Sequence, residues 1–349
     1  MIIKSPSASL KDVEGVNQAL EGVWTPVEEF MSQKDTNPYL YSDSHKRYQT
    51  YEYWLRKTFG GKCAKIPLDG GFTCPNMDGT CGIGGCIYCS DRGSGDFASS
   101  CDLPLREQYE AQRKRLSEKW STDRCIAYFQ ARTNTYAPVK ILREKFEEVL
   151  SFDHVVGLNI ATRADCLPPE TVEYLAELSQ RTLLTVELGL QTVHDNTARL
   201  INRGHTLEQF RDGYTRLTQA SPRIHTCVHM ILGLPGETLS MMQDSMRVVA
   251  ALRPTMVKLH LLHVLRGTLL GEMYGQGAYI PMTQEAYVHA VVRCLELLPP
   301  ETVIARLTGD GNGKMLLAPL WSIKKMAVIN DIDQLMFSEN TWQGRLYQA

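Results

Sequence analysis

The sequence has no apolar run that approaches the roughly 20 residues needed to span a bilayer. Its first residues, Met1 to Pro6, contain neither a long apolar stretch nor an obvious cleavage site of the kind that marks a secretory signal. The formal net charge is only −2, so a nucleic acid would have to be bound through a local basic patch. These absences predict a cytoplasmic protein with no membrane partner.

Cysteine is present in a clear pattern, with ten in 349 residues. In a reducing cytoplasm, clustered cysteines indicate a metal site or catalysis more often than disulfides. Four of them, Cys74, Cys81, Cys86 and Cys89, fall within sixteen residues. We expect the other six to be buried small hydrophobes or incidental thiols: Cys63, Cys101, Cys125, Cys166, Cys227 and Cys294.

Short apolar runs alternate with amphipathic stretches along most of the chain, which is typical of parallel strands covered by helices. Six such strand–helix units are too few for a closed eight-stranded barrel. We therefore predict an α/β fold, a partial (β/α)6 barrel with a small C-terminal α/β extension. The predicted strands cover residues 64–68, 125–129, 155–160, 183–188, 224–231 and 256–262.

The chain divides into three predicted parts. Residues 1–42 are mixed and polar and form an N-terminal appendage that could be mobile. Residues 43–270 hold the barrel. Residues 271–349 form an extension that caps its open side, with a helix over 284–298, a strand over 302–307 and a final helix over 324–336.

The cysteine cluster directly follows the first predicted strand. Cys86 and Cys89 form a C-x2-C pair, and Cys74 joins them across a glycine-rich loop that allows close backbone approach. Three thiolates on a [4Fe–4S] cube leave one iron open to a chelating small molecule. A zinc ion held by these three cysteines and Cys81 is the alternative that the spacing leaves open.

Several motifs occur in order between Lys46 and Gly344: Phe72-Thr73-Cys74-Pro75-Asn76, Tyr128-Phe129-Gln130-Ala131, Glu187-Leu188-Gly189-Leu190-Gln191-Thr192, Asn202-Arg203-Gly204-His205, Gly233-Leu234-Pro235-Gly236-Glu237-Thr238 and Arg306-Leu307-Thr308-Gly309-Asp310-Gly311. Together they resemble the YhcC-like family of radical S-adenosylmethionine (SAM) proteins. The core also resembles the radical SAM half of the elongator Elp-three proteins, which act on wobble uridines of tRNA. Two positions depart from the family pattern: Arg132 replaces an aromatic residue and Ala305 replaces a histidine.

The resemblance implies an enzyme with a [4Fe–4S] cluster on Cys74, Cys86 and Cys89 and with SAM on the open iron. It gives Cys81 no ligand role. A flavodoxin or ferredoxin is the kind of electron donor that such an enzyme uses. By the same resemblance, SAM is bound by polar residues after the strands: Gln130, Asn134, Thr162, Arg163, Asp165, Glu187, Gln191, Arg203 and Gly233.

Some of these predicted SAM contacts have an alternative explanation. Arg163 and Asp165 could simply pair with each other and brace the barrel. Glu187, at a buried strand end, needs a ligand hydroxyl or a nearby arginine as its partner. The turn that begins at Gly233 could be an ordinary connection between a strand and a helix.

The predicted substrate is RNA, and specifically a modified wobble uridine of tRNA. Residues 46–65 carry six basic residues, including Lys46 and Arg47, interleaved with five aromatic ones, a composition suited to phosphates and bases. His263 and Arg266 follow the sixth strand and could also face substrate. The alternative for residues 46–65 is an amphipathic helix packed on the barrel. The alternative functions are radical chemistry on a small metabolite or tetrapyrrole, and a zinc-stabilised RNA-binding module without catalysis.

Overall fold

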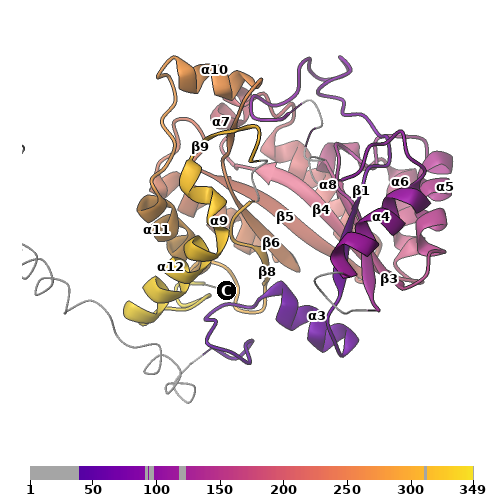
Figure 1. Ribbon diagram of the computed structural model, residues 1–349, viewed down its shortest axis with the longest axis horizontal. Coiled ribbons are helices and arrows are strands. Elements are labelled where there is room, and N and C mark those ends of the chain that lie inside the picture. The colour runs from indigo at the N-terminus through magenta and orange to yellow at the C-terminus, as the bar shows by residue number, and fades with distance from the viewer. Residues whose placement is uncertain (1–38, 91–92, 94–97, 118–122, 310–312, 349) are drawn as a thin grey trace, which may run out of the picture. The chain divides into compact units, whose positions relative to one another are not determined.

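Seven parallel strands form one sheet in the order β1-β2-β3-β4-β5-β6-β8 (Figure 1). The computed structural model describes residues 39–90, 93, 98–117, 123–309 and 313–348. Strand β2 is buried at every position, as expected for a parallel strand covered on both faces. The predicted α/β partial barrel is confirmed. The strands are β1 (Ala64–Leu68), β2 (Cys125–Phe129), β3 (Val155–Thr162), β4 (Leu183–Gln191), β5 (Ile224–Leu232), β6 (Met256–Leu261) and β8 (Val303–Arg306).

The seventh strand comes from the C-terminal part of the chain. Strand β8 pairs in parallel with β6, and Thr50 forms a parallel bridge with Ile304 of β8. Strands β7 (Val264–Leu265) and β9 (Leu316–Ala318) form a small antiparallel sheet. The barrel sheet therefore continues across the predicted boundary at residue 270. Residues 39–349 form one compact unit, whereas positions 1–38 of the predicted appendage lie outside the described residues.

Helices cover the strands and begin at recognisable caps. The Thr238 side chain accepts a hydrogen bond from Met241 N at the start of α9, and Thr206 and Gln209 form a capping box at the start of α8. None of the helices in the described residues has the length and apolar character that crossing a membrane takes. The helices are α3 (Tyr51–Phe59), α4 (Leu105–Ser117), α5 (Val139–Leu150), α6 (Pro169–Leu178), α7 (Asp195–Leu200), α8 (Leu207–Ala220), α9 (Leu239–Leu252), α10 (Leu269–Gly275), α11 (Gln284–Leu295) and α12 (Lys325–Ser338).

Helix α3 carries most of the basic and aromatic stretch and packs its aromatic side chains on the barrel. The Trp54 ring contacts the His225 ring edge to face, with 5.3 Å between the ring centroids, and Tyr51 stacks on Trp54 with 5.8 Å between the centroids. His225 lies near the start of β5, so α3 covers the N-terminal ends of the strands (Figure 1). This placement agrees with the packed-helix alternative and puts α3 at the opposite end from the strand termini that carry the predicted site.

Candidate functional site

A cavity of about 310 Å³, which we call the central cavity, opens at the carboxyl ends of the strands, and Cys74, Cys86 and Cys89 all line it. Cys74 begins a turn in which its carbonyl accepts from Met77 N at 2.8 Å. Cys89 N donates to Cys86 O at 3.0 Å, so the C-x2-C pair also lies on a tight turn. The fold therefore brings the three predicted cluster ligands to one cavity.

Left-handed backbone shapes the loop between these cysteines. Gly84 and Gly85 have φ of 80° and 74°, a conformation that only glycine adopts at little cost. This curvature lets Gly85 N donate to Asn76 O at 2.9 Å. The Asn76 Nδ2 atom lies 3.8 Å from Cys86 Sγ, which makes it a donor beside one of the thiolates.

The turn from Asn202 to His205 holds this loop from the opposite side. Asn202 Nδ2 donates to Gly85 O at 2.7 Å and to Ile83 O at 3.3 Å. Asn76 Nδ2 donates in return to Asn202 O. We call Asn202–His205 the clasp turn, because it joins the connection after β4 to the cysteine loop.

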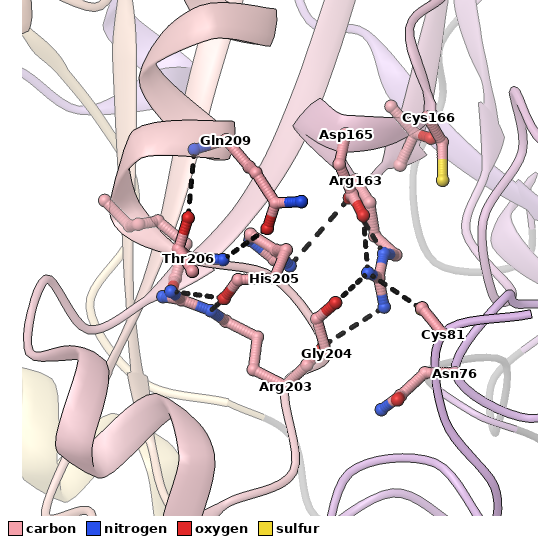
Figure 2. Close-up of polar contacts among 12 residues, drawn as sticks. Asn76, Cys81, Arg163, Asp165, Cys166, Arg203, Gly204, His205, Thr206 and Gln209 are labelled. Atoms are coloured by element: carbon pink, nitrogen blue, oxygen red, sulfur yellow. Dashed lines mark hydrogen bonds and ion pairs between the residues drawn. The ribbon is translucent and has the colours of Figure 1, made fainter.

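Arg163 reinforces the same region, as Figure 2 shows. Its guanidinium pairs with both oxygens of Asp165, at 3.0 and 2.6 Å, and donates to the carbonyls of Arg203 and Gly204, each at 3.0 Å. The Nη2 atom that donates to Asp165 and Gly204 also lies 3.4 Å from Cys81 Sγ. Burial lowers the pKa of Arg163, but the ion pair with Asp165 raises it above its usual value. The arginine therefore stays charged and braces the clasp turn.

Arg203 is buried, with its side chain 1% exposed, and binds backbone carbonyls. It donates to Leu190 O at 2.5 Å, to Thr192 O at 2.6 Å and to His205 O at 2.8 and 2.9 Å. Although Arg203 borders the cavity, these bonds satisfy most of its five donors. The geometry gives it a role in shaping the end of β4.

The other predicted SAM residues fall into three places. Gln130, Thr162 and Gln191 line the central cavity, and Gln191 Oε1 is buried without a hydrogen-bond partner. Asn134 is fully buried and donates to Ala161 O at 2.8 Å. Gly233 lines a second cavity, of about 760 Å³, between the start of α9 and α11.

The predicted substrate residues are dispersed. His263 lines the central cavity, whereas Arg266 does not. Lys46 pairs with Asp333 on α12, and Arg47 donates to Asn340 Oδ1 at 2.9 Å. Lys46 and Arg47 therefore lie against the C-terminal helix. Neither residue lines the central cavity, so the cavity does not support their predicted contact with substrate.

A buried ionic cluster that the sequence did not reveal lies inside the barrel. The Glu187 carboxylate accepts from Lys65 Nζ at 2.5 Å, from Asn159 Nδ2 at 2.7 Å and from His229 Nε2 at 2.9 Å. Lys258 Nζ also pairs with it. We call these five residues the inner cluster. The charged residues within predicted strands, Glu187, Lys65 and Lys258, were the available signals.

Charge compensation explains why Glu187 is stable inside the barrel. Burial by itself raises its pKa, but the ammonium groups of Lys258 and Lys65 hold the pKa well below the ordinary value. Glu187 is thus ionised and already has protein partners. Sequence reasoning had expected a ligand hydroxyl or an arginine there.

Three thiols that line one cavity are the kind of donor set that holds an iron–sulfur cluster. A hydrogen bond from the Cys89 thiol lowers the pKa of Cys86 to about 7, and it raises that of Cys89 well above its usual value. Among the described residues, no three cysteine, histidine or acidic side chains are grouped as a single ion requires. Cys81 is exposed and does not line the cavity. Cys74, Cys86 and Cys89 would therefore hold the cluster without Cys81.

Comparison with known proteins places the chain in the radical SAM superfamily. The Radical SAM superfamily model matches residues 79–249, and the Radical_SAM C-terminal domain model matches residues 254–338. The uncharacterized protein YtqA of Bacillus subtilis is 47% identical over 312 residues, covering 89% of this chain and 96% of YtqA. Protein YhcC of Escherichia coli is 33% identical, with coverage of 83% and 92%.

Similarity also extends to elongator proteins. Mouse elongator complex protein 3 is 30% identical over 166 residues, which is 46% of this chain and 29% of that protein. The solved structure of archaeal Methanocaldococcus infernus Elp3 superimposes with a TM-score of 0.61 at 18% identity, covering 80% of this chain and 64% of the other. That structure supports the shared fold. With its cysteine cavity, its half-barrel and these relatives, the chain belongs to the YhcC-like family of radical SAM enzymes.

Proposed function

We propose that this radical SAM enzyme modifies RNA, with a modified wobble uridine of tRNA as its substrate. The observation that carries the proposal is the sequence similarity of the barrel to elongator complex protein 3. The basic and aromatic stretch over residues 46–65 gives it no further support, because α3 packs against the other end of the barrel.

The residues present define what the chain itself would contribute. Cys74, Cys86 and Cys89 would hold the cluster, and Gln130 and Gln191 line the cavity beside them, where SAM would be bound. With one electron from a reductant, the bound cluster and SAM would supply radical hydrogen-atom abstraction from the substrate. The clasp turn and Arg163 keep the cysteine loop in place. A flavodoxin or ferredoxin remains the predicted electron donor.

The test uses total tRNA from a strain that lacks the gene. Reconstituted enzyme, SAM and a reductant are added under anaerobic conditions, and the digested nucleosides are compared by mass spectrometry. We expect one wobble nucleoside to change mass, together with formation of 5′-deoxyadenosine. Enzyme that cleaves SAM but neither binds this tRNA nor alters its nucleosides would contradict the RNA proposal and favour a small metabolite or tetrapyrrole.

A further inference from the structure

The inner cluster carries an unbalanced charge. Lys65 and Lys258 are its two ammonium groups, and both pair with the single Glu187 carboxylate. In the part of the chain that the structure describes, neither lysine has a second acidic partner. His229 stays neutral near pH 7, because burial lowers its pKa to about 4. With both lysines protonated, the five residues therefore have a net charge of +1.

A buried positive charge without a counterion is unfavourable. Removing an ammonium group from water is costly unless an anion lies close to it. Glu187 can compensate one of the two lysines but not both. Burial accordingly lowers the pKa of Lys65 to about 7. A second anion placed beside these ammonium groups would be strongly attracted.

The cluster is accessible from the cavity that the three thiols line. Glu187, His229 and Lys258 all border it, as does His260 on the same strand as Lys258. Lys258 Nζ lies 3.5 Å from Tyr128 OH. The Nε2 atom of His260 is buried without a hydrogen-bond partner. A ligand in the cavity could therefore meet an ammonium group and a free imidazole nitrogen together.

We propose that the inner cluster is an anion-binding site for the substrate, with Lys258 as its charged contact and His260 as a second one. The ligand is an oxyanion, a carboxylate or a phosphate. Under the proposed function, on which this inference rests, it would be an acidic side group of the modified uridine or a phosphate beside it. Binding there would place the rest of the substrate between Lys258 and the three cysteines.

The experiment titrates reconstituted enzyme with 13C-acetate and, separately, with inorganic phosphate, and follows each anion by NMR. We expect one anion to bind, and Lys258→Met to weaken its binding by about tenfold or more, as the loss of a hydrogen bond to a charged group would do. Lys258→Arg should retain binding. The matched control is Lys140→Met, which removes an exposed lysine of α5.

Acetate binding alone would indicate an acidic side group, phosphate binding alone a nucleotide phosphate, and binding of both a general oxyanion site. Wild-type enzyme that binds neither anion, or equal binding by wild type and Lys258→Met, would overturn the proposal. Iron content and melting temperature report whether Lys258→Met folds. If it does not, His260→Ala, which leaves the ion pairs intact, is compared in the same way. These titrations contain no tRNA, so their result is separate from the test of the RNA substrate.

Discussion

The clasp turn makes a direct prediction about cluster retention. Asn202 has φ of 52°, so replacing it with glycine preserves the left-handed backbone while removing the side-chain amide. Asn202→Gly loses the bonds to Gly85 O at 2.7 Å and to Ile83 O at 3.3 Å. At about 0.5–1.5 kcal/mol each, with the longer and more exposed bond the weaker, their loss costs about 1–2 kcal/mol.

That free energy corresponds to a population of the opened cysteine loop that is about fivefold to thirtyfold larger. The assay is the rate at which an anaerobic ferrous chelator removes iron from the reconstituted enzyme. We expect this rate to rise by about the same factor in Asn202→Gly. The control is Asn340→Gly, at a second left-handed asparagine, with φ of 47°, that follows α12.

Asn340→Gly also loses a side-chain hydrogen bond, the one from Arg47, but it lies away from the cysteine loop. It should lower the melting temperature without accelerating iron loss. The reasoning would be refuted if iron left both variants equally fast, or if Asn202→Gly retained iron as well as the wild type does.

Three further predictions concern buried groups. Burial lowers the pKa of His205 to about 3, so on acidification the unfolded chain takes up a proton that the folded chain does not, and the free energy of unfolding should fall by about 1.4 kcal/mol between pH 7.5 and 5.5 through this group. Anaerobic urea unfolding of His205→Asn should show a smaller fall over this pH range than the wild type does. A fall equal to that of the wild type would contradict the assignment. Gly204→Ala would place a Cβ atom 2.6 Å from Asn76 Oδ1, whereas the Cβ atom of Gly236→Ala, at another left-handed glycine, would meet nothing within 4 Å. Iron loss should therefore be faster in Gly204→Ala and unchanged in Gly236→Ala. Equal rates of iron loss in the two variants would count against crowding at the clasp turn. Glu187→Gln leaves two buried ammonium groups without a carboxylate, and the free energy of unfolding measured in urea should fall by about 3–5 kcal/mol. A fall below about 1 kcal/mol would mean that solvent already screens the charges of the inner cluster.

Local sequence patterns predicted the barrel and the cysteine cavity because both depend on neighbouring residues. The spacing of Cys86 and Cys89 and the alternation of strands with helices are visible within short segments. The Arg163–Asp165 pair could likewise be foreseen as an alternative, since its members are two positions apart. The structure shows that pair together with the contacts from Arg163 to the clasp turn.

Long-range partners could not be read from the sequence. Lys65 and Lys258 are 122 and 71 positions from Glu187, and only the curvature of the sheet brings the three together. For the same reason the sequence left open whether residues 46–65 form an RNA-binding surface or a packed helix. Aromatic and basic residues on a helix have the same pattern whether they face a nucleic acid or, like Trp54, pack on the end of a barrel.

The central claim is that three cysteines hold a cluster that cleaves SAM. It is tested most directly by anaerobic reconstitution of wild type, Cys86→Ala and Cys81→Ala, followed by addition of SAM and dithionite. Iron, sulfide and 5′-deoxyadenosine are then measured. We predict that wild type and Cys81→Ala contain a [4Fe–4S] cluster and form 5′-deoxyadenosine, whereas Cys86→Ala loses both. A colourless wild-type protein that contains zinc, or a Cys81→Ala variant that loses the cluster, would contradict the account.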